Sequence, residues 1–299
     1  MKKIWLFLKR YLRWAILGGT LFFLAKALKA SAKEVAAIHI DGMGWANLAL
    51  ALIFTLLAHT WAGLVWSWIL HELRQPVSPR WALQVYLKTN LAKYLPGNVW
   101  HYYGRVSAVT EAGGSLGAAT LSVLLEPLLM AAAAILVALA GSQLNAARWG
   151  WQVFSLVAIC LAVHPRILNL VIEILSRLKG KATDASVFRL ERYPLLPLLG
   201  ELGFLGLRGT GFLFALQALT PVNPSQLPQV LSAFSLAWLL GLIVPGAPGG
   251  IGVFEATVTV LLDKQFSPGL LLGVVALFRV ASILAEAVAA GLASLLRIL

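Results

Sequence analysis

Charged residues are scarce in this chain. Only 12% of its 299 residues are Asp, Glu, Lys or Arg, while 60% are hydrophobic and the mean hydropathy is +0.83. A typical soluble domain carries about 25% charged residues. The shortage of charge excludes an ordinary soluble protein. Apolar runs long enough to cross a hydrocarbon core of about 30 Å instead predict an all-α, polytopic membrane protein.

Cysteine is almost absent. The single cysteine, Cys160, lies within an apolar run, which excludes an internal disulfide and a cysteine-based metal site. The histidines are not spaced as metal ligands, and the sequence has no GxxxxGK phosphate loop and no Ser-His-Asp arrangement. The run GAPGGIG, residues 246–252, mimics a dinucleotide-binding fingerprint but stands inside an apolar segment. We therefore expect no cofactor and no bound metal.

Acidic residues are half as frequent as basic ones, 12 against 24, so the net charge is +12. The basic residues stand in short flanks between apolar runs, where they set the orientation of membrane spans. This placement argues against nucleic acid as a partner.

Hydropathy predicts about six full spans, near residues 12–30, 45–71, 118–140, 149–164, 194–219 and 269–295. The positive-inside rule places both termini and the basic connection 165–193 in the cytoplasm. In that connection, apolar residues recur at helical spacing from Ile167 to Leu178, which predicts an interfacial helix. The basic N-terminus with its short apolar run also fits a cleaved signal peptide, and this alternative stays open.

Two further apolar segments, 82–105 and 229–264, are interrupted by Pro-Gly. Counting spans between cytoplasmic loops favours segments that enter and leave on one side, the first from the cytoplasm and the second from outside. With the helices that follow, they would form an inverted-topology repeat, 82–140 and 229–295, within one membrane domain 1–299. If each broken segment instead crossed the membrane completely, the positions of the charged loops would be satisfied equally well, so both arrangements stay open.

The Pro-Gly breaks are candidate substrate-binding points. Proline removes a backbone donor and glycine permits positive φ, so the helix unwinds there and exposes N–H groups to an anion. Unwound backbone at membrane depth must line a cavity or be buried in protein. The backbone candidates are Pro96, Gly97, Pro245, Gly246, Gly249, Gly250 and Gly252.

Ionisable residues inside the apolar segments are the second group of candidates, because an intramembrane charge is usually paired or faces a cavity. Arg105 and Glu255 follow the two breaks at nearly equivalent offsets, and Glu126 and Arg279 lie in the helices after them. His101 lies in the first broken segment and could hydrogen-bond a headgroup.

Three more buried charges fit a simpler interpretation. Glu201 and Arg208 stand seven residues apart, and Arg279 and Glu286 have the same spacing. Each pair would lie two turns apart on one helix face, which predicts local ion pairs of structural origin.

At these residues the chain resembles the lysylphosphatidylglycerol synthase transmembrane-region family of flippase-like membrane proteins. The resemblance rests on YLPG followed by Gly104-Arg105, on Glu126, on VPGAPGGIGVFE, residues 244–255, and on Arg279. It implies translocation of lipids or lipid-linked headgroups between leaflets. The first break departs from the family pattern, with NVWHYYGR in place of more glycines and Pro127 in place of an arginine.

Lysyl-transferring members of that family carry a fused soluble aminoacyltransferase, which this sequence does not contain. We therefore expect a bacterial inner-membrane translocase for an anionic or amphipathic lipid, passive or ion-coupled, rather than an enzyme. Two alternatives remain: a membrane enzyme with Glu126 or Glu255 as general base, or a scaffold that docks a glycosyltransferase. Membrane lipids are the expected partners, a lipid-synthesis enzyme is a further candidate, and a homo-oligomer stays open.

Overall fold

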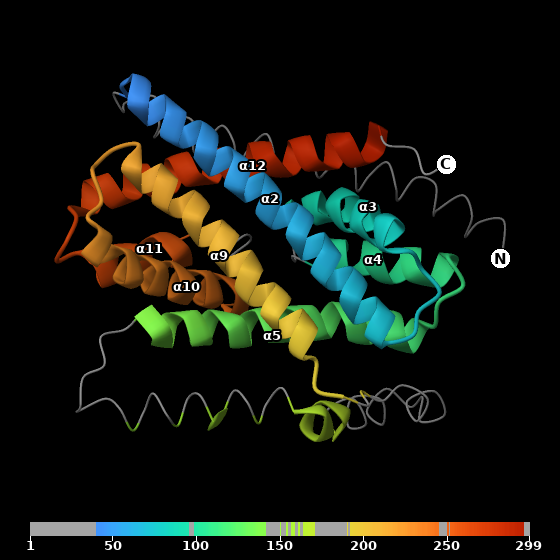
Figure 1. Ribbon diagram of the computed structural model, residues 1–299. Coiled ribbons are helices and arrows are strands. Elements are labelled where there is room, and N and C mark those ends of the chain that lie inside the picture. The colour runs from blue at the N-terminus through green and yellow to red at the C-terminus, as the bar shows by residue number, and fades with distance from the viewer. Residues whose placement is uncertain are drawn as a thin grey trace.

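The computed structural model describes residues 40–95, 99–141, 164–170, 192–244 and 252–295, with the single positions 150, 154, 157, 158, 161, 190 and 250. All regular structure in this part of the chain is helical (Figure 1). The predicted span 12–30, most of the predicted span 149–164, and most of the basic connection 165–193 lie outside the described residues. Of the predicted interfacial helix, residues 167–170 are described and are helical.

Five helices among the described residues are long and apolar enough to cross a membrane. Four coincide with predicted spans: α2 (Gly42–Glu72), α5 (Leu116–Gly141), α9 (Leu195–Gln217) and α12 (Pro268–Leu295). The fifth, Pro224–Ile243, joins the 3₁₀ turn η2 (Pro224–Gln226) to α10 (Leu227–Ile243). The chain is therefore a helical membrane protein, as composition predicted.

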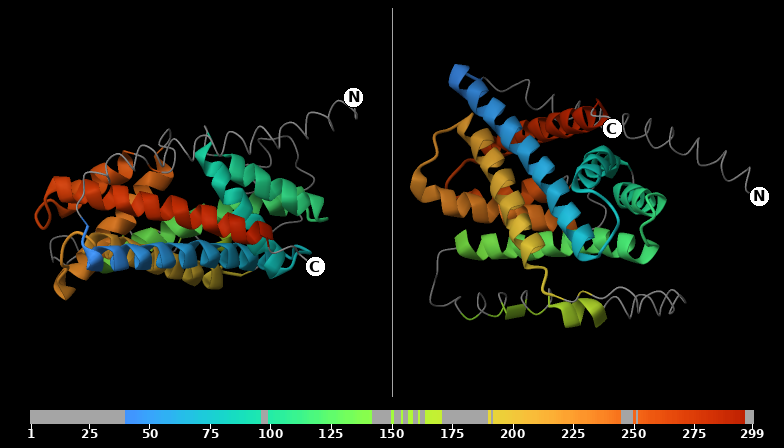
Figure 2. Two further views of the ribbon diagram at one scale, coloured as in Figure 1. Left: turned by 90° about the horizontal axis from the view of Figure 1, so that it is seen from above. Right: turned by 45° about the vertical axis from the view of Figure 1, so that its right-hand side comes forward.

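Helices α2 and α9 lie side by side along one face of the molecule (Figures 1 and 2). Gly200 and Gly203 on α9 leave space for indole rings of α2, because a Cβ at either position would lie under 3.0 Å from a side chain of α2. The indole of Trp61 donates to the carbonyl of Gly200 at 2.7 Å. Small residues at this contact allow the close approach typical of membrane helices.

The first broken segment forms two short helices joined near the break. Helix α3 (Pro79–Asn90) continues into the 3₁₀ turn η1 (Leu91–Tyr94), and α4 (Trp100–Glu111) follows. Ser78 caps α3 by accepting from the backbone N–H of Trp81 at 3.3 Å, and Pro79 occupies the first turn, where no donor is needed. Pro96 and Gly97 lie outside the described residues.

The second broken segment consists of α10 and α11 (Val253–Leu262), which pack against each other. Gly250 and Gly252 have φ of +72° and +86°, a region that glycine adopts without strain, and α11 begins immediately after them. Pro245, Gly246 and Gly249 lie outside the described residues. The α3–α4 pair and the α10–α11 pair lie at opposite ends of the bundle, on either side of α2 and α9 (Figure 1).

In each broken segment, the start of the first helix lies close to the end of the second. The side chain of Gln75, before α3, accepts from the backbone N–H of Ser115, after α4, at 3.0 Å. In the second half, the side chain of Gln265, after α11, donates to that of Gln229 at the start of α10. Both broken segments therefore return the chain close to where they began.

Phenylalanines from four helices fill the core of the second half. Phe212 of α9, Phe234 of α10, Phe254 of α11 and Phe278 of α12 have ring centroids 5.4 to 6.4 Å apart. Several of the contacts are edge-to-face, the arrangement that aromatic quadrupoles favour. This cluster fixes the positions of α9 to α12 around one side of a central cavity.

Candidate functional site

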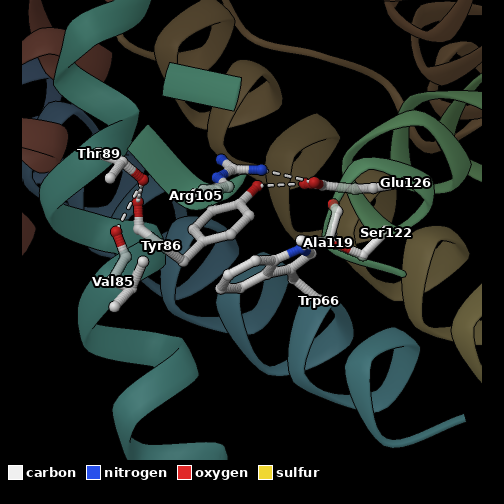
Figure 3. Close-up of polar contacts among 8 residues, drawn as sticks. All are labelled: Trp66, Val85, Tyr86, Thr89, Arg105, Ala119, Ser122 and Glu126. Carbon is white, nitrogen blue, oxygen red and sulfur yellow. Dashed lines mark hydrogen bonds and ion pairs between the residues drawn. The ribbon is translucent and has the colours of Figure 1, made fainter. Parts of the chain in front are cut away.

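The first element of the site is a buried ion pair. Arg105 of α4 donates from Nη1 to Oε2 of Glu126 on α5 at 2.5 Å, and the two side chains are only 2% and 4% exposed. The hydroxyl of Tyr86 on α3 donates to the other carboxylate oxygen at 2.7 Å. Figure 3 shows both groups converging on Glu126. Removing two charges from water is favourable only when they are paired and hydrogen-bonded in this way.

Aromatic rings complete the surroundings of Arg105. Its guanidinium lies 3.7 Å from the ring centroid of Tyr86 and 5.7 Å from that of Trp66, distances typical of cation–π contacts. The indole of Trp66 donates to Ser122 at 3.2 Å and so links α2 to α5 beside the ion pair (Figure 3). Helix α5 continues through Pro127, which follows Glu126 directly. Arg105 is therefore held rigidly by three helices.

The second element joins α11 to α12. Arg279 pairs with Glu255 at 2.5 Å and donates to the carbonyl of Gly250 at 3.4 Å. The other carboxylate oxygen of Glu255 accepts from the backbone N–H of Gly252 at 2.8 Å. One N–H group at the start of α11, where the sequence predicted an anionic ligand, is thus occupied by the protein's own carboxylate. This pair is more open than the first, with side chains 19% and 22% exposed.

A third charged cluster surrounds Glu286. Glu286 of α12 accepts from Lys93 at 2.6 Å and lies 3.0 Å from Nε2 of His59 on α2. The same His59 nitrogen lies 3.4 Å from Nη1 of Arg208 on α9. Arg208 also stacks on the rings of Trp238 and Phe278, at 5.1 and 4.9 Å.

All three clusters line one cavity of about 270 Å³. Its walls come from α2, α3, η1, α4, α5, α9, α10, α11 and α12, so both broken segments contribute to it. Aromatic residues alternate with the charges, as in sites that bind a ligand with polar and apolar parts.

The structure brings together most of the predicted residues that it describes. His101, Arg105, Glu126, Gly250, Glu255 and Arg279 line the cavity. Gly252 does not line it, but its N–H positions Glu255. Pro96, Gly97, Pro245, Gly246 and Gly249 lie outside the described residues.

The predicted local ion pairs are wrong. Arg279 binds Glu255 rather than Glu286, which binds Lys93 and His59 instead. Arg208 contacts His59, and both carboxylate oxygens of Glu201 are buried with no hydrogen-bond partner in the described part of the chain. Contacts across helices prevail because charges two turns apart on one helix do not meet directly.

Sequence reasoning therefore missed His59 and Lys93 as members of the site and gave Arg208 and Glu286 a purely structural role. A signal for Lys93 was present, since it stands three residues before the first Pro-Gly. His59 gave none, because a lone histidine in an apolar helix looks like any packed residue. Among the described residues, no group of three or more His, Cys, Asp and Glu side chains could hold a metal ion.

In the comparison with known proteins, no family model and no curated protein matches the chain.

Proposed function

We propose that the protein translocates an amphipathic or anionic lipid between membrane leaflets. The observation that carries this proposal is a cavity lined by charge clusters from both broken segments of a helical membrane protein. Buried charge in a membrane protein is costly, and it most often marks the path of a substrate or ion. The cavity would accept the polar headgroup while the acyl chains remain in lipid.

The arrangement of the short helices supports a re-entrant topology. Helix α3 has 12 residues and α4 has 12, each about 18 Å long, well short of a hydrocarbon core of about 30 Å. Together with the neighbouring ends noted above, these lengths favour a hairpin in the first half. In the second half, where α10 belongs to a stretch long enough to cross, the contact between Gln229 and Gln265 supports a second hairpin, which we infer to enter from the opposite side. This is the inverted-repeat plan of many carriers.

The two ion pairs would then have different roles. Arg105–Glu126 is enclosed and held by Tyr86 and Trp66, so we assign it to the closed end of the cavity. Arg279–Glu255 is about five to ten times more exposed, so we assign it to the mouth, where separation of the pair would admit a headgroup. Transport would be passive or coupled to an ion.

The likeness to flippase-like membrane proteins belongs to this proposal and rests on the residues of the broken segments. The bacterial inner membrane as the location, and a lipid-synthesis enzyme or glycosyltransferase as a partner, are also part of this proposal.

A dithionite-quench assay in proteoliposomes tests the proposal. Vesicles would contain a trace of acyl-labelled fluorescent phosphatidylglycerol or phosphatidylcholine, of which dithionite reaches only the outer leaflet. We expect the purified protein to expose the inner-leaflet probe to quenching. A protected fraction equal to that of protein-free vesicles, for both lipids and for a glycosylated lipid, would reject the proposal.

Variants connect the assay to the cavity. Arg105→Ala and Glu255→Gln should each slow quenching, provided that size-exclusion profiles show an intact fold. Arg80→Ala is the matched control, because Arg80 is an exposed cation at the start of α3 outside the cavity. Equal rates in all three variants would remove the cavity from the mechanism.

A further inference from the structure

Arg208 differs from the other cations of the cavity. Lys93, Arg105 and Arg279 each form an ion pair with a glutamate, whereas Arg208 has no carboxylate within salt-bridge distance in the described part of the chain. It is only 4% exposed and is held by the faces of Trp238 and Phe278. A buried guanidinium with no carboxylate in direct contact leaves a favourable place for an anion.

The contact between Arg208 and His59 does not supply an acceptor. Nε2 of His59 is 3.0 Å from the Glu286 carboxylate, an acceptor, and 3.4 Å from the Arg208 guanidinium, a donor. A ring nitrogen either carries a proton or accepts one, and the shorter contact, to a carboxylate, indicates the neutral tautomer in which Nε2 carries the proton. Arg208 therefore faces a second donor there.

Unpaired donors are in excess around the cavity. Nε of Arg105, Arg208 and Arg279 and Nε1 of Trp238 are buried N–H groups without an acceptor within the described residues. Among carboxylate oxygens of the wall, only Oε2 of Glu286 lacks a partner there. The donors come from four different helices of the cavity wall, α4, α9, α10 and α12. They match a ligand with several acceptor oxygens.

The charge of the wall sets the charge of the ligand. Four cations, Lys93, Arg105, Arg208 and Arg279, face three carboxylates, Glu126, Glu255 and Glu286, which leaves one positive charge when the histidines are neutral. A volume of about 270 Å³ lies below the usual range for drug-sized ligands, so the headgroup must be small.

We propose that Arg208 is the primary anion ligand of the cavity, and that the site takes the singly charged phosphate of a phosphodiester lipid with a small headgroup. This inference rests on the proposed function and changes its detail: Arg105 and Arg279 position the site through their glutamates, and Arg208 binds the phosphate.

Isothermal titration calorimetry on the purified full chain in detergent tests this assignment. The probes are dihexanoyl phosphatidylmethanol, a phosphodiester, dihexanoylglycerol, which lacks phosphate, and inorganic phosphate, which lacks chains. We expect saturable binding of the phosphodiester, none of dihexanoylglycerol, and binding of inorganic phosphate weaker by more than about tenfold. Loss of one charge-assisted hydrogen-bond donor in Arg208→Gln should weaken phosphodiester binding by roughly tenfold or more.

Arg80→Gln, the same change at an exposed position, should bind as the wild type does. If Arg208→Gln does not fold, Arg208→Lys keeps the charge without the guanidinium fork, and we expect it to bind at intermediate strength.

The wild-type comparison among the three probes needs no variant. Equal binding of dihexanoylglycerol, equal binding of inorganic phosphate, or unchanged affinity in the Arg208 variants would overturn the assignment. Binding does not require flipping. Phosphodiester binding without translocation would therefore reject only the proposed function. Translocation that does not depend on Arg208 would reject only this site.

Discussion

Gln75 and Ser115 join the two ends of the first broken segment: the Gln75 side chain accepts from the Ser115 backbone N–H at 3.0 Å, across α3 and α4. A chain that crossed the bilayer between these residues would place them about 30 Å apart. The side chains of Gln229 and Gln265 make the corresponding contact in the second half, across α10 and α11.

The first prediction concerns topology. In a Cys160→Ser background, we expect Arg80→Cys and Ala112→Cys to react with a membrane-impermeant maleimide from one side of the membrane. Ser225→Cys and Lys264→Cys should react from the other side. All four positions are exposed, so burial does not limit labelling. Arg80 and Ala112 on opposite sides would show that the first segment spans completely.

The second prediction compares the two ion pairs. Double-mutant cycles with Arg105→Gln and Glu126→Gln should give a larger coupling in thermal stability than cycles with Arg279→Gln and Glu255→Gln. The first pair is enclosed, so breaking it leaves an uncompensated buried charge and costs about 3–5 kcal/mol. The second pair is partly exposed, and we expect at most about 1 kcal/mol there.

Tyr86→Phe is the control for the first cycle, because it removes only the hydroxyl bond to Glu126. It should cost about 1–3 kcal/mol. Equal coupling in the two pairs would contradict the burial argument.

The third prediction concerns a helix contact. A Cβ on Gly141, at the end of α5, would lie 2.2 Å from the carbonyl oxygen of Pro228 on α10. Backbone cannot move away as a flexible side chain can, so Gly141→Ala should destabilise the protein by about 1–3 kcal/mol.

Gly206→Ala is the matched control, since a Cβ there meets nothing within 4 Å. Alanine favours helix over glycine, so this variant should be unchanged or up to about 1 kcal/mol more stable. Thermal melts followed by size-exclusion chromatography measure both. Equal melting temperatures would show that α5 and α10 do not pack as described.

The fourth prediction separates two buried glutamates. Glu286→Gln should lower thermal stability because it leaves Lys93 and His59 without their carboxylate. Glu201→Gln should change the free energy of unfolding by less than about 0.5 kcal/mol or increase it, because the Glu201 carboxylate has no hydrogen-bond partner among the described residues. A loss in Glu201→Gln as large as in Glu286→Gln would reveal a partner for Glu201.

Composition and periodicity predicted much of the fold. Long apolar runs predicted α2, α5, α9 and α12 because burial of apolar side chains in lipid depends on length and hydropathy, which are local properties. Pro-Gly marked the two interruptions for an equally local reason: proline lacks the donor that a continuous helix needs. Arg105 and Glu126 stood out because charge is costly in an apolar segment, whatever its partner.

Partners, by contrast, depend on how helices meet. Sequence spacing suggested Glu201 with Arg208 and Arg279 with Glu286, yet the folded chain pairs Arg279 with Glu255 and Glu286 with Lys93, 193 residues away. It also leaves Arg208 between two aromatic rings. The sequence by itself determined that charges lie inside a helical membrane protein. Only the tertiary structure decided which of them are neutralised, because ion pairing requires contact across helices, and helix packing sets which charges face one cavity.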